Sequence, residues 1–427
     1  MNRKYTYRSM HLDCARHFFS VETVKKVIEG ISYGNLNVLH WHLTDDHAWR
    51  IESKKFPRLH ESSGQYYTQD EIREIIDYAK ERGIDVIPEI DMPGHNLALL
   101  SVFPQFSCKG ETVTPAKARG VYKTILCAGK EETYAFVEEL LDEMIPLFDS
   151  QYFHIGGDEA PKDEWKECPD CSAKMKALGL ANYEDLQGYF TGKVCEMLKK
   201  YGKTPIVWND ALLAKNLPED AIVQYWTIDY AKEMSNFVDK GGKWIYSDMF
   251  ELYLDYPHSM IPLKKVYEFT PHLYKYPIQG SKSAQKGDEK ITGLMGFEAC
   301  CWTEHIDNEK DLCEHIFPRV YAMAERADGE EHTDYESFKN RIREITTLLE
   351  KAGIPYTKEE WWDPKGKARR EDAIQFYFNM SAGVDEEEAK KQAASAAPKI
   401  EFVLHFIREF YKMVDVPAFL WKLLVKK

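Results

Sequence analysis

The sequence has no long hydrophobic run. No stretch of about 18 consecutive apolar residues, the length that crosses a membrane as a helix, occurs in the 427 residues. The first ten residues are polar and lack the apolar core of a secretory signal. We therefore expect no membrane partner and a cytoplasmic location.

An excess of basic residues is also missing. Lysine and arginine number 56 against 70 aspartate and glutamate residues, so the formal net charge is −14 at pH 7. Surfaces that bind nucleic acid or anionic membranes are usually basic, because they must neutralise phosphate groups. The composition therefore argues against nucleic acid and anionic membranes as partners.

The nine cysteines form no recognisable disulfide framework. Their number is odd, their spacing is loose, and Cys300 and Cys301 are adjacent. Cys168 and Cys171 lie three residues apart, a spacing that suits either a disulfide or two positions on a metal ion. Since no second pair has this spacing, we favour free thiols, and we expect neither a metal nor another cofactor.

Short β-branched or leucine-rich runs alternate with longer amphipathic segments through most of the chain. This alternation is typical of βαβ units, which build a parallel sheet. The predicted strands are residues 10–13, 36–43, 85–90, a run that ends at 156, 204–208, 221–226, 244–246 and 294–301. An α/β barrel accommodates eight such units in one domain. We therefore predict an α/β protein with a TIM (β/α)8 barrel over residues 1–353.

Helices are predicted between these strands. Residues 21–33 carry apolar side chains at helical spacing. Thr68 and Glu71 form a capping box for a helix that ends at Gly83. Two further helices are predicted over residues 131–148 and 335–352.

Beyond about residue 328 the pattern becomes purely helical. We predict a C-terminal helical extension over residues 354–427, with helices at 371–380 and 398–413. Pro398 suits a first helical position, where no N–H donor is needed. The apolar segment 417–425 fits either packing on the barrel or a homodimer contact, and we favour packing.

Residues 152–160 combine a buried strand with two acidic side chains. The strand leads into Gly156 and Gly157, which let the backbone turn sharply and carry Asp158 and Glu159 out of the strand. Neighbouring carboxylates repel each other, so one of them is expected to keep its proton near neutral pH and serve as a general acid. The alternative is that one of them caps the following helix.

Polar or tryptophan side chains follow most of the predicted strands. They are Arg16, Asp45, Asp91, His95, Asp158, Glu159, Trp208, Trp226, Trp302 and Glu304. In a barrel of this kind the catalytic groups come from the C-terminal ends of different strands. Packing does not explain the pattern, because it acts on apolar residues within the strands rather than at their ends.

Five ordered motifs carry a resemblance to a known family. They are LDCARHFF at 12–19, LHWHLTDD at 39–46, PEIDMPGH at 88–95, HIGGDE at 154–159 and WTE at 302–304. Over residues 8–328 the chain resembles glycoside hydrolase family 20, the exo-β-N-acetylhexosaminidases. The small α/β domain that many members carry ahead of the barrel has no counterpart in the seven residues before Arg8.

The resemblance implies an exo-acting, retaining enzyme that removes terminal non-reducing β-linked GlcNAc or GalNAc from oligosaccharides. In this family the 2-acetamido group of the substrate acts as the nucleophile and forms an oxazolinium intermediate. Glu159 would be the acid and base, and Asp158 would hold the acetamido N–H and stabilise the cationic intermediate. Tyr253 matches the tyrosine that donates to the acetamido carbonyl.

The same resemblance implies how the first sugar is bound. Arg16 would grip the 3- and 4-hydroxyls, while Asp255 and Glu304 would accept from the 4- and 6-hydroxyls. The predicted walls of the sugar pocket are Trp208, Trp226 and Trp302, and the predicted supporting network behind Glu159 is Asp45, Asp91 and His95. Indole rings suit the apolar faces of a sugar, and charged groups suit its hydroxyls.

Two alternatives stay open at this stage. His40 and His42, together with His95, His154 and Asp158, resemble the ligand set of a metal-dependent barrel hydrolase. We instead expect His40 and His42 to be buried and hydrogen-bonded, because they lie within a strand. A sugar-binding barrel without turnover is the other alternative, although such a protein has no need of the acidic pair. The choice between GlcNAc and GalNAc, the natural glycan and the oligomeric state also stay open.

Overall fold

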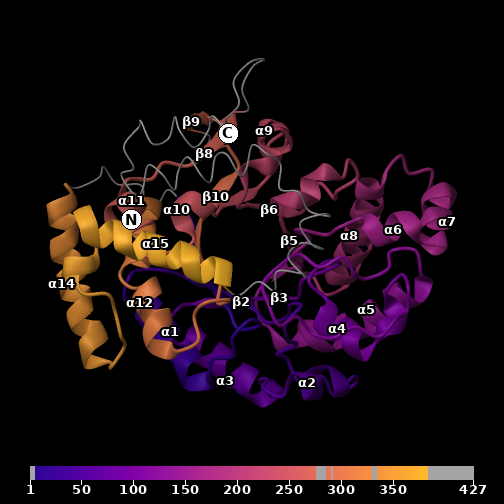
Figure 1. Ribbon diagram of the computed structural model, residues 1–427, viewed down its shortest axis with the longest axis horizontal. Helices are drawn as coiled ribbons and strands as arrows, with labels where there is room; N and C mark the ends of the chain where they lie inside the picture. The colour runs from indigo at the N-terminus through magenta and orange to yellow at the C-terminus, as the bar shows by residue number, and fades with distance from the viewer. Residues whose placement is uncertain (1–4, 276–284, 290–291, 329–333, 383–427) are drawn as a thin grey trace.

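The computed structural model describes residues 5–275, 285–289, 292–328 and 334–382. Its centre is a closed barrel with the strand order β1-β10-β7-β6-β5-β4-β3-β2 (Figure 1). The barrel strands are β1 (Tyr7–Asp13), β2 (Val38–His42), β3 (Asp85–Glu89), β4 (Tyr152–His154), β5 (Thr204–Trp208), β6 (Ile222–Tyr225), β7 (Trp244–Tyr246) and β10 (Leu294–Cys301). All neighbouring pairs in the barrel are parallel. The predicted TIM barrel is therefore confirmed.

Helices surround the barrel on its outside (Figure 1). They are α1 (Val21–Ser32), α2 (Arg58–Ser63), α3 (Gln69–Lys80), α4 (Leu97–Val102), α5 (Glu131–Met144), α6 (Asp163–Glu167), α7 (Pro169–Leu178), α8 (Tyr183–Lys200), α9 (Ala231–Asp239), α10 (Met249–Leu252), α11 (Leu263–Glu268), α12 (Glu309–Ile316), α13 (Arg319–Asp328), α14 (Tyr335–Lys351) and α15 (Gly366–Ala382). Among the described residues, no helix has the length and apolar character needed to span a membrane.

Local sequence signals explain where several helices begin and end. Thr68 and Glu71 form the predicted capping box at the start of α3. The helix predicted over 131–148 ends earlier, at Met144, and continues as a short 3-10 turn over Ile145–Leu147. Pro146 explains the change, because it cannot donate the N–H that an α-helix needs.

The barrel interior changes character along the strands. Toward the N-terminal ends of the strands lies an apolar cluster of Tyr7, Val38, Ile87, Ile206, Ile222 and Ile245. Two residues further along these strands, the buried side chains are polar: Ser9, His40, Glu89, Trp208, Gln224 and their neighbours His154 and Glu298. Side chains two apart on a strand share a face, so one face of each strand supplies both layers. The polar layer lies directly behind the C-terminal ends, where the active site of this fold is built.

The histidines of β2 are buried and have polar partners, as predicted. His40 Nδ1 lies 2.8 Å from Glu298 Oε1. His42 Nε2 lies 3.1 Å from Asp45 Oδ2, and its other ring nitrogen pairs with Glu89. These two rings therefore belong to the packed polar layer of the barrel.

The chain after residue 353 is described only in part. α15 covers the helix predicted at 371–380, whereas the predicted helix 398–413 and the apolar segment 417–425 lie outside the described residues. The boundary at residue 353 stays a prediction. The structure also contains a small antiparallel sheet of β8 (His272–Lys275) and β9 (Gln285–Glu289), which the sequence did not predict.

Candidate active site

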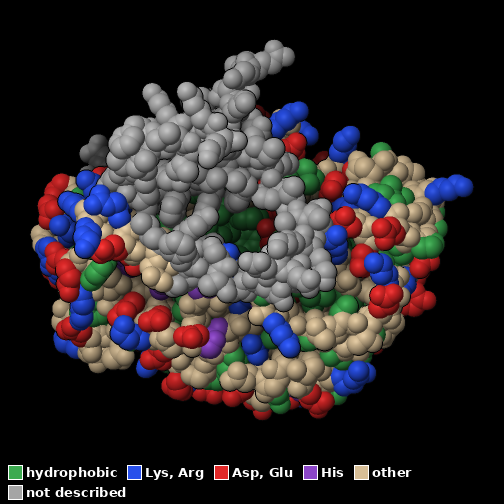
Figure 2. Space-filling model, in the orientation of Figure 1, with side chains coloured by type: hydrophobic (Ala, Val, Ile, Leu, Met, Phe, Trp, Pro, Cys, Tyr) green, Lys and Arg blue, Asp and Glu red, His purple; other side chains and the backbone are tan. Residues whose placement is uncertain are grey.

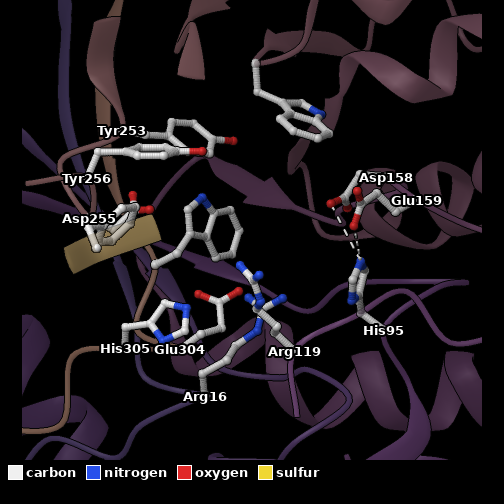
Figure 3. Close-up of a pocket in the computed structure, with 13 residues that line it drawn as sticks. Arg16, His95, Arg119, Asp158, Glu159, Tyr253, Asp255, Tyr256, Glu304 and His305 are labelled. Carbon is white, nitrogen blue, oxygen red and sulfur yellow. Dashed lines mark ion pairs between the residues drawn. The ribbon is translucent and has the colours of Figure 1, made fainter. Parts of the chain in front are cut away.

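A pocket of about 740 Å³, including its open mouth, lies at the C-terminal ends of the barrel strands. It is lined by Arg16, His95, Arg119, Asp158, Glu159, Trp226, Tyr253, Asp255, Tyr256, Trp302, Glu304, His305 and Phe376. Figure 2 shows a central hollow on this face with hydrophobic side chains at its base. In Figure 3, Asp158, Glu159 and His95 lie on one side of the pocket, and Arg16, Arg119, Asp255 and Glu304 lie on the other.

The turn after β4 brings Asp158 and Glu159 into the pocket. Gly156 and Gly157 have φ angles of 62° and 94°, which suit glycine. A Cβ atom on Gly156 would lie 1.7 Å from Oδ1 of Asp91, and the N–H of Gly157 donates to the same oxygen at 2.9 Å. The next helix, α6, has Lys162 as its N-cap. The alternative that one of the two acids caps this helix is therefore wrong.

Glu159 has the environment of a general acid. Its backbone φ is 42°, a strained value for a residue other than glycine. Its side chain is 38% exposed, and its N–H donates to Asp210 Oδ1 at 3.2 Å. Desolvation in the pocket and the negative charge of Asp210, opposed by the positive charge of His95, raise the pKa of Glu159 to about 7. A group with this pKa can give and take a proton near neutral pH.

Asp158 is more deeply placed than its neighbour. Its Oδ1 is buried and finds no hydrogen-bond donor among the described residues. Burial, followed by the nearby carboxylate of Asp91, raises the pKa of Asp158 well above its usual range. A buried oxygen without a donor is costly, and a donor on a bound molecule would remove this cost.

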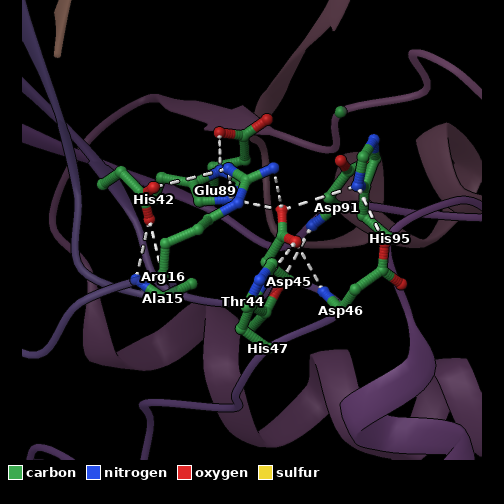
Figure 4. Close-up of polar contacts among 12 residues, drawn as sticks. Ala15, Arg16, His42, Thr44, Asp45, Asp46, His47, Glu89, Asp91 and His95 are labelled. Carbon is green, nitrogen blue, oxygen red and sulfur yellow. Dashed lines mark hydrogen bonds and ion pairs between the residues drawn. The ribbon is translucent and has the colours of Figure 1, made fainter. Parts of the chain in front are cut away.

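His95 lies between the acidic pair (Figure 3) and the carboxylates of Asp45 and Asp46 on the loop after β2 (Figure 4). Its Nε2 lies 3.7 Å from Glu159 Oε2 and 3.8 Å from Asp158 Oδ2, and its Nδ1 lies 3.2 Å from Asp46 Oδ2. Burial lowers the pKa of His95, but Asp45 and Asp46 outweigh burial and raise it well above its ordinary value. The imidazole is therefore positively charged, and its φ of 52° is also strained.

Asp45 connects this network to Arg16. Its Oδ2 forms an ion pair with Arg16 Nη2 at 2.7 Å and lies 3.1 Å from His42 Nε2. Although burial opposes the effect, Arg16 and His95 hold the pKa of Asp45 well below its usual range. The guanidinium of Arg16 also lies over the Trp302 ring, 4.8 Å from the centroid. Arg16 is thus fixed in place at the pocket surface, where it lines one wall.

Asp91 supports the turn rather than the pocket wall. Its Oδ1 accepts from Gly157, and the side chain is buried. Burial is the main cause that raises its pKa, to about 8; His95 opposes the shift and Glu89 adds to it.

Three aromatic rings form one side of the pocket. The rings of Trp226 and Tyr253 are nearly parallel, at 14°, with centroids 6.3 Å apart, and Tyr253 lies 6.2 Å from Trp302. Trp226 Nε1 donates to Asp210 Oδ2 at 2.8 Å. Backbone contacts to β10, including a bridge between Tyr253 and Cys300, hold Tyr253 in place.

Asp255 and Glu304 lie across the pocket from the acidic pair (Figure 3). Burial, followed by the negative charge of Glu304, raises the pKa of Asp255 well above its usual range. The side chain of Glu304 is exposed, and Arg119 lies near it. This end therefore offers several hydrogen-bonding groups within a small space.

Trp208 is the predicted wall residue that the structure does not bring into the pocket. Its indole is only 1% exposed and is not among the lining residues. Its Nε1 donates to Glu89 Oε1 at 2.8 Å, and its ring lies 5.9 Å from that of Trp302. Trp208 thus lies in the polar layer directly behind Trp302, and its role as a wall of the sugar pocket stays a prediction.

Several residues near the pocket were not predicted. They are Arg119, Tyr256, His305 and Phe376 among the lining residues, and Asp210 beside Glu159. Asp210 follows β5, so the rule that selected other strand ends also applies to it. Arg119 lies in a long loop, and Phe376 comes from α15; neither position carries a recognisable motif.

Comparison with known proteins places these features in a family context. The model of the glycosyl hydrolase family 20 catalytic domain matches residues 5–329. A β-hexosaminidase of Porphyromonas gingivalis is 35% identical over 82% of this chain and 47% of that protein. A β-hexosaminidase of Vibrio furnissii is 31% identical over 75% of this chain and 56% of that protein. The chain thus spans about half the length of the curated relatives it matches.

Solved structures agree with the sequence comparison. A chitobiase of Flavobacterium johnsoniae is 33% identical, with a TM-score of 0.73 over 91% of this chain and 56% of that one. An exo-β-N-acetylglucosaminidase of Vibrio harveyi, solved with N-acetylglucosamine, is 32% identical, with a TM-score of 0.73 over 84% of this chain and 60% of that one.

Proposed function

The chain belongs to glycosyl hydrolase family 20, and from this membership we propose that it removes terminal non-reducing β-linked N-acetylhexosamine from oligosaccharides. The observation that carries the proposal is the acidic pair on one side of the pocket. Glu159 has a pKa of about 7, and the neighbouring Asp158 has a buried Oδ1 without a donor among the described residues. One group can protonate a leaving oxygen, and the other can accept an N–H from the substrate.

The proposed reaction uses the acetamido group of the substrate as the nucleophile. Glu159 gives its proton to the glycosidic oxygen while the acetamido carbonyl oxygen forms a bond to C1. The glycosidic C1–O bond breaks in this step, and the rest of the oligosaccharide leaves as an alcohol. Although burial disfavours the charged form of Asp158, an N–H donor and a neighbouring cation both stabilise a carboxylate. With substrate bound, ionised Asp158 accepts the acetamido N–H and balances the positive charge of the oxazolinium ion, and Tyr253 donates to the carbonyl oxygen. Water then gives a proton to Glu159 and bonds to C1, and the bond between C1 and the acetamido oxygen breaks. Two successive displacements at C1 retain the anomeric configuration.

The remaining pocket residues are proposed to hold the sugar. Arg16, fixed by Asp45, faces the 3- and 4-hydroxyls, while Asp255 and Glu304 accept from the 4- and 6-hydroxyls. Trp226 and Trp302 pack on the ring and the acetamido methyl group. His95 is a positioning residue, because its cation lies within 4 Å of both catalytic carboxylates. A cytoplasmic location, with imported short oligosaccharides as substrates, is part of the proposal.

The experiment that tests this function compares two chromogenic substrates, nitrophenyl N-acetyl-β-glucosaminide and nitrophenyl β-glucoside. They differ only in the 2-substituent, so cleavage of the first alone is expected if the acetamido group is the nucleophile. Comparable cleavage of both would indicate a protein nucleophile. Cleavage of both substrates that disappears with a chelator and returns with a divalent metal would instead favour a metal-dependent hydrolase, because substrate-assisted cleavage acts on the first substrate alone.

Glu159→Gln separates turnover from binding. We expect kcat to fall by about 10²–10⁴, the usual contribution of a general acid, with product binding retained. Glu167→Gln, at an exposed site on α6, is the matched control and should keep full activity. Unchanged kcat in Glu159→Gln would remove Glu159 from its role, and binding without turnover in the wild type would point to a sugar-binding protein.

A further inference from the structure

Four cysteine side chains lie together where two segments of the chain come into contact. The same two segments also carry His95 and the acidic pair. Cys108 and Cys127 belong to the segment after β3, and Cys168 and Cys171 belong to the segment after β4. Their sulfur atoms all lie within 4.8 Å of one another. Cys127, Cys168 and Cys171 are buried, and Cys108 is half-buried.

The sulfur separations fit a shared metal ion. Sγ of Cys171 lies 3.8 Å from that of Cys108 and 3.6 Å from that of Cys127, and Sγ of Cys127 lies 3.8 Å from that of Cys168. A disulfide joins sulfurs in single pairs at about 2.05 Å. Four thiolates arranged tetrahedrally at about 2.3 Å from Zn²⁺ lie about 3.8 Å from one another. We propose that Cys108, Cys127, Cys168 and Cys171 together bind one structural Zn²⁺ ion.

The backbone of the first segment already brings two ligands together. Ser107 and Leu126 form an isolated antiparallel bridge, and the N–H of Cys127 donates to the carbonyl oxygen of Phe106 at 2.7 Å. These contacts close the two ends of the loop between them. Cys108 and Cys127 therefore leave the neck of this loop side by side, although 19 positions separate them in the sequence.

The second segment supplies its ligands from the start of a helix. Cys168 is the N-cap of α7, and Cys171 lies in its first turn. The positive end of the helix dipole favours thiolates at these positions. A Cβ atom on Gly129 would lie 2.2 Å from the backbone nitrogen of Cys171 and 2.3 Å from the carbonyl carbon of Asp170. A glycine is needed for the two segments to come this close.

Zinc binding at this cluster balances chemically without any further reactant. Four thiols release four protons as they become thiolate ligands, and no electron transfer is needed. The centre then has two negative charges. The ammonium of Lys130 lies at the same neck, where it donates to the carbonyl oxygens of Gln105 at 2.8 Å and Ser107 at 2.6 Å, and it offsets part of this charge.

A zinc ion at this cluster would also hold in place a loop that lines the pocket. The relevance of this effect to substrate binding rests on the proposed function. The loop that Cys108 and Cys127 close contains Arg119, which lines the pocket near Glu304. Zinc would hold the neck of this loop against α7. The segments that carry His95 and Glu159 would thus be joined outside the barrel as well as through it.

Metal content is the direct test of the site. The full chain, purified without chelators or metal-affinity resin, is expected to contain about one zinc ion per chain when its metal content is measured by inductively coupled plasma mass spectrometry. A mercurial thiol reagent should release that zinc to a chromogenic chelator, and all nine cysteines should titrate as thiols after unfolding. Iron in place of zinc, or no metal together with disulfides among the four cysteines, would overturn the proposal.

Serine variants locate the ion. Cys127→Ser and Cys171→Ser are expected to lose most of the bound zinc, whereas Cys195→Ser should keep it. Cys195 is the matched control, because it is fully buried in α8 but lies outside the cluster. Equal zinc content in all three variants would contradict the assignment. Metal content is measured without any glycosidase assay. A chain without glycosidase activity could therefore still be shown to bind zinc, and a chain without zinc could still be shown to be a glycosidase.

Discussion

Glu159 lies between a positive and a negative neighbour, and the two act on its proton in opposite directions. His95 lies 3.7 Å from the Glu159 carboxylate and lowers its pKa, while Asp210, which accepts the Glu159 N–H, raises it. Together with desolvation, they hold the pKa at about 7. A general acid must be protonated to work, so activity is present below this pKa and is lost as pH rises through it.

Two variants should therefore move the basic limb of the pH profile of kcat/KM in opposite directions. His95→Gln removes the positive charge, which raises the pKa of Glu159 and shifts the limb upward. Asp210→Asn removes the negative charge, which lowers the pKa and shifts the limb downward. Profiles of the two variants and the wild type, measured on the nitrophenyl substrate, check this. Shifts in the same direction would mean that the limb reports another group.

At the scale of elements, the turn after β4 depends on one close contact. Gly156 combines a φ of 62° with a Cβ position 1.7 Å from Asp91 Oδ1, so any side chain there would push Asp91 away from Gly157. Gly202 has a similar φ of 70°, but nothing lies within 4 Å of its Cβ position. The two glycines thus share the backbone conformation and differ in their surroundings.

Alanine at these two positions separates backbone strain from displacement. Gly202→Ala is expected to cost about 1 kcal/mol of stability, the price of a left-handed residue, and to leave kcat unchanged. Gly156→Ala should cost more and should also lower kcat by about tenfold or more, because the acidic pair follows it directly. Denaturant unfolding and steady-state kinetics measure both effects. Equal losses in the two variants would show that the Asp91 contact does not position the pair.

The sequence predicted those elements whose signals are local. The strand periodicity, the Thr68–Glu71 capping box and the Gly156–Gly157 turn all depend on neighbouring residues, and the structure contains each of them. The cysteine cluster depends on a contact between two segments, so the spacing of Cys168 and Cys171 alone favoured free thiols. The position of Trp208 could not be predicted from local signals either, because the side chain of a residue at a strand end can point into the barrel or toward its mouth.

At the scale of the whole molecule, a helix late in the chain, α15, reaches the pocket. Phe376 on α15 lines it, with ring centroids 5.5 Å from Tyr256 and 6.3 Å from His305. The alternation of strands and helices predicted the barrel, but the helical pattern after residue 353 does not indicate which surface α15 covers. The contribution of this helix to the pocket could therefore not be predicted.

Phe376→Ala tests whether α15 contributes to substrate binding. We expect KM to rise about three- to tenfold, since an aromatic contact contributes about 0.5–1.5 kcal/mol, with a smaller change in kcat. Glu371→Ala, at an exposed position of the same helix, is the control and should leave KM unchanged. An unchanged KM in Phe376→Ala would indicate that the ring only covers the pocket rim.

His95 and Glu159 share a feature that affects how this protein would respond to selection. Both have left-handed backbone conformations, at φ angles of 52° and 42°, and each costs about 1–3 kcal/mol relative to a relaxed residue. Glycine at either position would relieve this strain while removing a group on which the proposed chemistry depends. Selection for heat resistance alone would therefore favour inactive proteins at these two positions, and only a screen that also demands turnover would keep them.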